Sequence, residues 1–254
     1  MRGEKYKERL REREYELIAS SISDVVGRKS STLKILEFGC GPGGGIEHLR
    51  KLGQLCLIDI NKNKRLTVPA DVKFFVADIR RTDFGDGEFD IVVSNQVLEY
   101  LGPKDAAFSE MKRIAKPDAY FVFSVPTAVW LILATPGQIQ KKVANVLVSM
   151  LKTNKNGERT KSNASGGACR RQEAGFLNKF AVTGHGFNPQ YSYCLREWRK
   201  RNWAKTLSSN DFEIVYKAPL LSYGSSHLPL IPPNRLMARL GLSSSYLFIC
   251  KKRR

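Results

Sequence analysis

The sequence has 254 residues and a mass of 28.6 kDa, which suits one large domain or one domain with an insertion. Hydrophobic residues make up 42% and charged residues 26%, so extensive disorder is excluded. The five cysteines are odd in number and include no C-x-x-C pair. We therefore expect neither a disulfide framework nor a metal site, and we expect a reducing, cytoplasmic compartment.

The net charge of +18 is concentrated in the second half of the sequence. Residues 1–126 contain 21 Lys and Arg against 19 Asp and Glu, whereas residues 127–254 contain 21 against 5. A basic surface of this kind favours an anionic partner such as nucleic acid, acidic lipid or a phosphorylated substrate, or it is a solvated face that keeps the protein soluble. Charge alone does not choose among these possibilities.

The first half of the sequence alternates between short apolar runs and helical patterns. A helix is predicted over residues 4–22, followed by a break at 27–31, and further helices are predicted over 46–53 and 96–115, the latter interrupted near 102–103. The apolar runs predict five strands, at 33–38, 54–60, 72–79, 89–95 and 118–125. Alternation of this kind indicates a parallel sheet with helices on both faces.

The second half follows a different pattern. Residues 127–151 are predicted to be helical, and residues 138–151 are amphipathic. Residues 153–185 are rich in Lys, Asn, Ser and Gly, which is typical of a mobile loop. A helix over 195–210 and two strands, at 211–219 and 244–252, complete the prediction. We divide the chain into an N-terminal helix (1–30), a core (31–126), a basic cap (127–205) and C-terminal strands (206–254).

The most informative segment is LEFGCGPGGG, residues 36–45. A strand that runs into glycines and then into a helix builds a nucleotide site at the carboxyl edge of a sheet. The spacing fits both the G-x-G-x-x-G of dinucleotide sites and a G-x-G-x-G pattern. Asp59, 20 residues past Gly39, could accept hydrogen bonds from the ribose hydroxyls of either ligand. The glycines alone therefore leave the choice of ligand open.

Several blocks in this region resemble the motifs of class I S-adenosylmethionine-dependent methyltransferases. LEFGCGPG resembles motif I with Glu37 as its acidic residue, LIDI the ribose motif, VADI the adenine motif, FDIVVSNQVLEYL the fourth-strand motif, and IAKPDAYFVFSVP the following turn and strand. Tyr100 stands where His is common, and Pro117-Asp118-Ala119 replaces Pro-Gly-Gly. A carboxylate at Glu37 also suits a cationic sulfonium ligand better than a pyrophosphate.

The resemblance implies a fold, a cofactor and a set of binding residues. The fold is a Rossmann-like, doubly wound α/β sheet of seven strands in the order 3-2-1-4-5-7-6, with the last strand antiparallel and a cap of helix and loop inserted after strand 5. The cofactor is S-adenosylmethionine, with S-adenosylhomocysteine as product. The residues implied to bind it are Glu37, Gly39, Gly41, Gly43, Asp59, Ile60, Asp78, Ile79, Asn95 and Leu98.

The second half gives a looser resemblance, to methyltransferases of cell-surface polysaccharide and glycolipid biosynthesis. It is carried by SVPTAVWLIL, a His-Gly pair at 185–186, Glu197-Trp198 and GLSSSYLFICKK, and it implies O-methylation of a saccharide or glycolipid. His185 is the candidate catalytic base, because a near-neutral imidazole suits proton transfer. The helix at 138–152 could contact an anionic membrane, which would make the protein peripheral at the inner membrane surface.

Other functions fit parts of the same sequence. An RNA methyltransferase is the second enzyme candidate, because the basic half with Trp198 and Trp203 could follow an RNA backbone and stack on its bases. Tryptophans at this spacing also anchor cores. A non-catalytic module that binds an adenosyl ligand, and a Rossmann dehydrogenase, are the remaining candidates. The acceptor is expected to be a small molecule, a glycan or a lipid-linked group.

Overall fold

The computed structural model describes residues 2–27, 33–153, 186–188, 190–224 and 234–253. Its helical elements are α1 (Arg2–Val26), α2 (Ile46–Leu49), η1 (Leu98–Tyr100), α3 (Asp105–Ile114), α4 (Ala128–Thr153), α5 (Tyr191–Glu197), α6 (Lys200–Ser208), α7 (Arg235–Met237) and η3 (Ala238–Leu242). Its strands are β1 (Lys34–Phe38), β2 (Gln54–Asp59), β3 (Lys73–Val76), β4 (Phe89–Asn95), β5 (Ala115–Pro126), β6 (Phe212–Pro219) and β7 (Ser245–Lys252).

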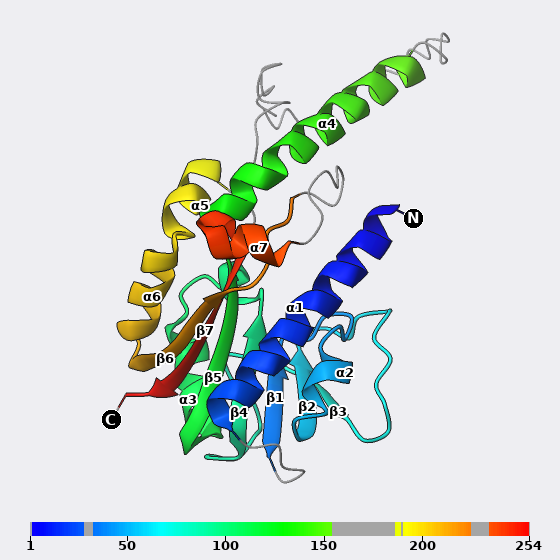
Figure 1. Cartoon of the computed structure of the whole chain (residues 1–254). Coiled ribbons are helices and arrows are strands. Elements are labelled where there is room, and N and C mark those ends of the chain that lie inside the picture. The colour runs from blue at the N-terminus through cyan, green and yellow to red at the C-terminus, as the bar shows by residue number, and fades with distance from the viewer. Residues whose placement is uncertain (1, 28–32, 154–185, 189, 225–233, 254) are drawn as a thin grey trace, which may run out of the picture.

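The seven strands form one sheet in the order β3-β2-β1-β4-β5-β7-β6, which is the order that the family resemblance implies (Figure 1). Strands β1 to β5 run parallel, and β7 is antiparallel to both of its neighbours, β5 and β6. The order reverses between β1 and β4, which lie side by side in the middle. The carboxyl ends of these two strands therefore form the crevice where ligands of such sheets bind.

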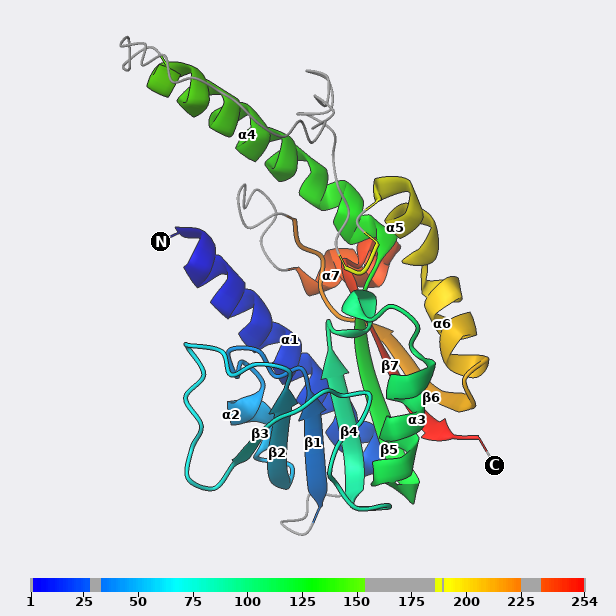
Figure 2. The same cartoon turned by 180° about the vertical axis from the view of Figure 1, so that it is seen from behind.

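Alternating apolar residues send side chains to both faces of the sheet, and each face is covered by helices (Figure 2). On β1, Ile35 packs in the layer with α1 and α2, whereas Leu36 packs in the layer with α3 and α6. Both side chains are fully buried. The period of two along a strand explains this division, and because helices cover both faces of the sheet, β1 is buried continuously from Ile35 to Phe38.

Helix α1 belongs to the core. Ile18 and Ile22 are fully buried against the sheet, at 0% and 1% exposure. They lie four residues apart, so they face the same side of the helix. The described helix of the predicted N-terminal segment, Arg2–Val26, therefore packs as part of the same layered structure.

Two predicted helices are divided in the structure. The predicted helix 96–115 becomes η1 and α3, with the break at the Gly102-Pro103 turn as expected. The predicted helix 195–210 becomes α5 and α6, because the chain turns at Arg199, whose backbone is extended. This turn lets the Trp203 indole nitrogen donate a hydrogen bond of 2.9 Å to the carbonyl of Pro126. Strand β5 also begins earlier than predicted, at Ala115.

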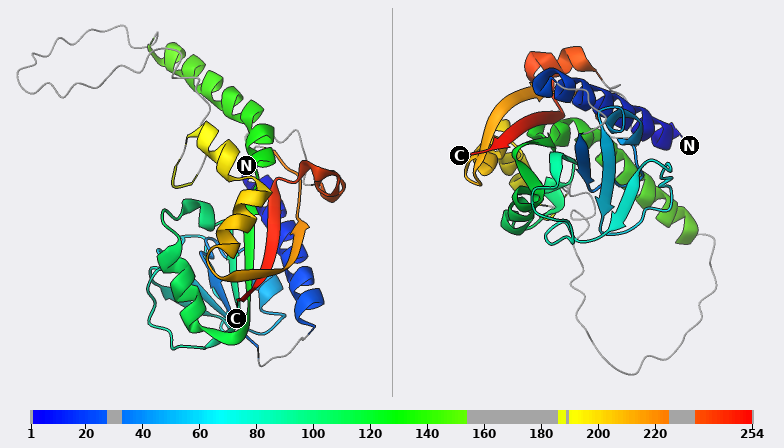
Figure 3. Two further views of the ribbon diagram at one scale, coloured as in Figure 1. Left: turned by 90° about the vertical axis from the view of Figure 1, so that its left-hand side faces the viewer. Right: turned by 90° about the horizontal axis from the view of Figure 1, so that it is seen from below.

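Helix α4 runs away from the body of the molecule (Figure 3). Its first turns are packed, and Leu131 is fully buried. Farther along, Ile139 and Val143 are exposed. Among the described residues, no helix is both long and apolar enough to cross a bilayer.

Candidate functional site

The glycine loop follows β1 directly and turns back through left-handed backbone conformations. Gly39, Gly41 and Gly43 have φ angles of 71°, 52° and 84°, which side chains with a Cβ adopt only at a cost. A Cβ on Gly39 would lie 2.4 Å from the Val97 side chain. A Cβ on Gly41 would meet nothing within 4 Å, so the backbone of Gly41 borders open space where a ligand can approach it.

Asp59, on the neighbouring strand β2, is hydrogen-bonded to the glycine loop. The Gly41 N–H donates a hydrogen bond of 2.8 Å to Oδ2 of Asp59, at the end of β2. The two residues predicted to contact the same ligand therefore lie together at the carboxyl edge. Ile60, the next residue, is 60% exposed at the same edge, where an apolar ring can cover it.

Glu37 is fully enclosed beneath this loop. Its Oε1 accepts a hydrogen bond from the hydroxyl of Tyr15, on α1, while its Oε2 has no hydrogen-bond partner among the described residues. Burial raises the pKa of the Glu37 carboxyl to about 7, and the bond from Tyr15 offsets only part of that shift. A Cβ on Gly45 would lie 2.5 Å from the Tyr15 ring, so the glycine lets α1 approach the loop closely.

Asn95 and Leu98 lie at the end of β4, beside the glycine loop. Asn95 is 7% exposed, and its Oδ1 has no hydrogen-bond partner in the described part of the chain. Leu98, in η1, is fully buried and packs in the core beside the carboxyl end of β4. Two buried acceptor oxygens, Oε2 of Glu37 and Oδ1 of Asn95, therefore have no hydrogen-bond donor among the described residues.

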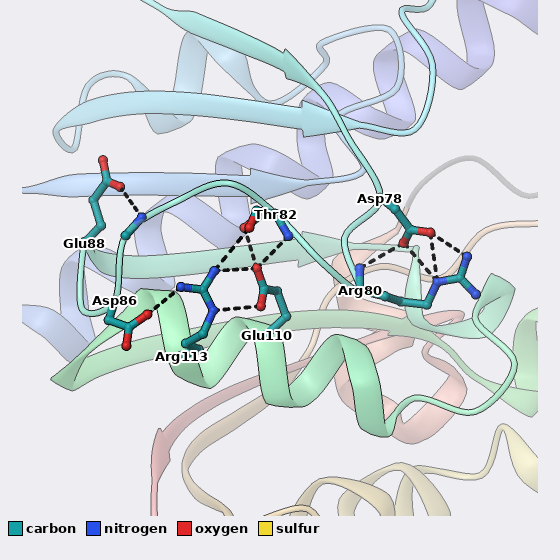
Figure 4. A network of polar contacts seen from close by, with 8 residues as sticks. Asp78, Arg80, Thr82, Asp86, Glu88, Glu110 and Arg113 are labelled. Carbon is teal, nitrogen blue, oxygen red and sulfur yellow. Dashed lines mark hydrogen bonds and ion pairs between the residues drawn. The ribbon is translucent and has the colours of Figure 1, made fainter.

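Asp78 and Ile79 follow β3 and have different environments. Ile79 is 8% exposed and packs in the core layer of α3. The Asp78 carboxylate forms an ion pair of 2.6 Å with Arg80, whose hydrogen bonds lower the pKa of Asp78 (Figure 4). Asp78 lies at the predicted edge, but its carboxylate is already paired, so an adenine amino group would have to share it with Arg80.

A polar network holds the loop that carries Asp78 onto α3 (Figure 4). Oε1 of Glu110 accepts hydrogen bonds from the backbone and the hydroxyl of Thr82, at 2.7 and 2.5 Å. Arg113 forms an ion pair with Glu110 and another with Asp86. The hydrogen bonds of Arg113 are the main cause that lowers the pKa of Glu110 to about 2. This network fastens the segment that follows Asp78 to α3.

Two residues of the site were not predicted from the sequence, Tyr15 and Glu99. Tyr15 lies 22 residues before Glu37, in a strongly charged helix and outside every motif recognised in the sequence. Glu99 lies inside the fourth-strand motif, but the sequence indicated the preceding residue, Leu98, as the site residue. Glu99 is 8% exposed, its Oε2 has no hydrogen-bond partner among the described residues, and burial raises the pKa of its carboxyl to about 7.

A cavity of about 340 Å³ opens beside η1. It lies between the start of α3 and the helices α5 and α6, and Lys104 Nζ lies 5.9 Å from the centre of the Trp203 ring on its wall. The cavity is lined by Glu99, Leu101, Gly102, Pro103, Lys104, Phe187, Asn188, Tyr193, Glu197, Trp198, Trp203 and Thr206. Aromatic rings, carboxyl groups and an amide therefore meet in one space.

Residues 186–188, which begin with the glycine of the predicted His-Gly pair, border this cavity. The Phe187 N–H donates a hydrogen bond of 2.8 Å to the carbonyl of Glu99. A Cβ on Gly186, whose φ is 87°, would lie 2.2 Å from that carbonyl, so only glycine fits there. His185 itself lies outside the described residues. Within the described ranges, no group of three His, Cys, Asp or Glu side chains is arranged to hold a metal ion.

Comparison with known proteins identifies the family. A family model described as a methyltransferase domain matches residues 9–216. The chain belongs to this family. With the seven-stranded sheet, this membership makes it a class I S-adenosylmethionine-dependent methyltransferase in family and fold.

The curated relatives match about two fifths of the chain. A malonyl-[acyl-carrier protein] O-methyltransferase of Buchnera aphidicola is 34% identical over 97 residues, which are 36% of this chain and 39% of that protein. A fatty-acid O-methyltransferase of Mycolicibacterium smegmatis is 29% identical over 111 residues, 40% of this chain and 38% of that protein. The chain thus spans about two fifths of the length of the curated relatives it matches.

Solved structures share the fold at low sequence identity. A 1,6-didemethyltoxoflavin-N1-methyltransferase of Burkholderia thailandensis, crystallised with S-adenosylhomocysteine, superposes with a TM-score of 0.55 at 14% identity, over 95% of this chain and 79% of that one. An S-adenosylmethionine-dependent methyltransferase of Mesorhizobium loti gives a TM-score of 0.51 at 14% identity, over 92% of this chain and 98% of that one.

Proposed function

We propose that this methyltransferase transfers the methyl group of S-adenosylmethionine to an oxygen atom of a saccharide or glycolipid acceptor. The observation that supports the donor part of the proposal is the hydrogen bond between Gly41 and Asp59, which joins the glycine loop to the proposed ribose ligand at the switch point of the sheet. When bound, the sulfonium donor supplies an electrophilic methyl group, so the protein has to align donor and acceptor and exclude water.

The residues around the loop fit this donor better than a dinucleotide. Gly41 offers open backbone, and Asp59 offers a carboxylate at the edge. Glu37 and Asn95 each keep a buried oxygen without a partner, which suits a ligand that carries an ammonium group. A pyrophosphate at this position would face a buried carboxyl group and would be repelled whenever that group is ionised.

The cavity beside η1 supports a hydroxylated acceptor. Saccharides present apolar faces that pack on aromatic rings and hydroxyl groups that bond to carboxylates and amides. Phe187 and Tyr193 supply exposed rings, and Asn188 supplies an amide. Two carboxyl groups, Glu99 and Glu197, share the wall with the ammonium group of Lys104, so charge alone does not choose between a hydroxyl and a carboxylate acceptor. The acyl substrates in the names of the curated relatives are therefore the alternative that the experiment must test.

A hydroxyl acceptor has to lose a proton, and two side chains are candidates to receive it. His185 precedes the Gly186 turn that contacts Glu99. The Glu99 carboxyl, with its pKa raised to about 7 by burial, is matched to proton transfer near neutral pH. We keep His185 as the proposed base, and Glu99 as the group that would replace it if a His185→Ala variant keeps its turnover.

The two alternative functions make different demands on the structure. An RNA methyltransferase would use exposed aromatic rings for base stacking, but Trp198 and Trp203 are only 4% and 5% exposed. This burial weighs against the RNA alternative. A non-catalytic module would bind the donor in the same cradle but would release no demethylated product.

Membrane contact and localisation are part of the same proposal. Lipid-linked acceptors would place the protein in the cytoplasm and at the inner membrane surface, with residues 138–152 on anionic lipid. Ile139 and Val143 on this segment are exposed, at 43% and 40%. No acidic residue occurs between Asp118 and Glu158, so this stretch carries no charge that would oppose such contact.

The test is transfer of a radiolabelled methyl group into separated glycan, lipid and RNA fractions of a cell extract. Label in the glycan or lipid fraction that is stable to mild alkali, as an ether is, supports the proposal. Label that mild alkali removes indicates methyl esters and would replace the acceptor class by carboxylates. Label in RNA, or no label with a protein that binds the donor, would reject the acceptor proposal.

A further inference from the structure

A short segment next to β7 exposes three large apolar side chains. Leu236, Leu240 and Leu242, in α7 and η3, are 66%, 75% and 45% exposed. Leu236 and Leu240 lie four residues apart and so share one side of the helical turns. Single exposed leucines are common on protein surfaces, but three within seven residues form a local apolar patch, which indicates an interaction site.

The leucines are held outward by a well-anchored backbone. Oδ1 of Asn234 accepts a hydrogen bond of 3.0 Å from the N–H of Met237 and so caps the first turn. Asn234 and Ser222 exchange two backbone hydrogen bonds of 2.9 Å, and the Ser222 hydroxyl donates to the carbonyl of Leu242. Ala238 is buried beneath the turn. Because both ends and the underside are fixed, the leucines cannot fold back onto the core.

Basic side chains flank the leucines. Arg235 and Arg239 are exposed and lie four residues apart, next to Leu236 and Leu240. The sequence contains no acidic residue after Glu213. An apolar pair beside a basic pair, with no opposing charge along this part of the sequence, is complementary to a surface with an apolar interior and anionic groups above it.

The segment lies at the same end of the sheet as the donor site. β7 starts directly after it, and the Ser245 hydroxyl donates a hydrogen bond of 2.6 Å to Oε1 of Glu14 on α1. The neighbouring Tyr15 is the residue that closes over Glu37. α7 and the start of α4 are both seen at this end in Figures 1 and 2.

We infer that residues 235–242 form a membrane-contact segment that docks the carboxyl end of the sheet on an anionic lipid bilayer. Leu236 and Leu240 enter the interface between headgroups and acyl chains, and Arg235 and Arg239 pair with anionic headgroups. This segment is separate from the stretch 138–152, and docking does not depend on which acceptor is methylated. Its consequence is that a lipid-linked acceptor would meet the enzyme at the mouth of its site.

The experiment is co-sedimentation of the full chain with vesicles of phosphatidylcholine alone and of phosphatidylcholine with phosphatidylglycerol. Each basic side chain near an anionic surface contributes about fivefold to the binding constant, so Arg235→Gln with Arg239→Gln should weaken binding to the mixed vesicles about 25-fold. Leu236→Ser with Leu240→Ser should weaken it at least about tenfold. The matched control, Lys252→Gln with Arg253→Gln, removes the same charge near the C-terminus and should change binding far less.

The outcomes separate docking from its rivals. Salt-sensitive binding to the mixed vesicles, lost in both double variants and retained in the control, supports the inference. Equal loss in the control would reduce the effect to net charge and overturn it. If light scattering shows a dimer that the leucine variant converts to a monomer without any change in vesicle binding, the patch is a subunit interface and the inference fails. Circular dichroism of each variant verifies that it is folded, and S-adenosylhomocysteine binding should be unchanged in all of them.

Discussion

The hydroxyl of Tyr15, on the N-terminal helix, donates a hydrogen bond to Oε1 of Glu37 at the end of β1. Both side chains are buried, at 5% and 0% exposure. The bond joins α1 to the base of the glycine loop, so the position of the helix and the state of the carboxyl group depend on each other.

Replacing Tyr15 by Phe removes that hydrogen bond and leaves a buried carboxyl group with no donor among its present neighbours. The free energy of unfolding should fall by about 1–3 kcal/mol, and S-adenosylhomocysteine binding should weaken. Urea unfolding and calorimetry measure the two effects. Tyr120→Phe, on the half-buried Tyr120 of β5, is the control, and both quantities should stay near the wild-type values in it. Equal effects in the two variants would show that the hydroxyl of Tyr15 has no special role.

The buried carboxyl groups predict a pH dependence of stability. Burial raises the pKa of Glu37 and of Glu99 to about 7, so between about pH 4.5 and 7 the folded protein holds protons that the unfolded chain has released. Their contribution to stability therefore falls as pH rises through this window. In Glu99→Gln the fall from pH 5 to 7.5 should be smaller than in the wild type by about 1–3 kcal/mol. The exposed Glu47→Gln should leave the profile unchanged, and a profile of Glu99→Gln identical to the wild type would contradict this assignment.

The network around Glu110 predicts the opposite sign. Hydrogen bonds from Arg113 lower the pKa of Glu110 to about 2, so its stabilisation is present above about pH 4.5 and is lost as pH falls toward 2. Glu110→Gln should unfold more easily than the wild type at pH 7, by about 1–2 kcal/mol. The difference between the two proteins should shrink as the pH is lowered from 5 to 3, as followed by thermal unfolding. A difference that stays constant over this range would show that the charge of Glu110 is not what holds the loop.

Gly41 and Gly87 provide a matched pair for the open side of the glycine loop. Their φ angles are 52° and 63°, and a Cβ on either would meet nothing within 4 Å. Alanine at either position should therefore cost about 1–2 kcal/mol of stability through backbone strain. Only Gly41→Ala should also weaken S-adenosylhomocysteine binding, because its Cβ projects where the ligand approaches. If both variants bind like the wild type, the ligand does not pass over Gly41.

The sequence predicted the strands, their order and the glycine–aspartate edge because these depend on local signals. Apolar runs and turn residues mark the strands, and the resemblance to known motifs supplies the order. It did not predict Tyr15, which lies 22 residues before its partner Glu37 in a strongly charged helix. Nor did it predict that Asp78 is paired with Arg80, since a side-chain conformation decides that contact. Nor did it predict the turn at Arg199 that divides α5 from α6 and accompanies the hydrogen bond from Trp203 to Pro126, a contact across 77 residues.

The most direct test of the donor site is calorimetric titration of S-adenosylhomocysteine, and separately of NADH, into the wild type, Asp59→Ala and Asp71→Ala. Asp59 accepts the Gly41 hydrogen bond at the proposed ribose position, whereas Asp71 pairs with Arg50 on the surface. We predict that the wild type and Asp71→Ala bind S-adenosylhomocysteine alike, that Asp59→Ala loses about 1–3 kcal/mol of binding free energy, and that NADH does not bind. Binding of NADH without any response to S-adenosylhomocysteine, or unchanged affinity in Asp59→Ala, would contradict the account.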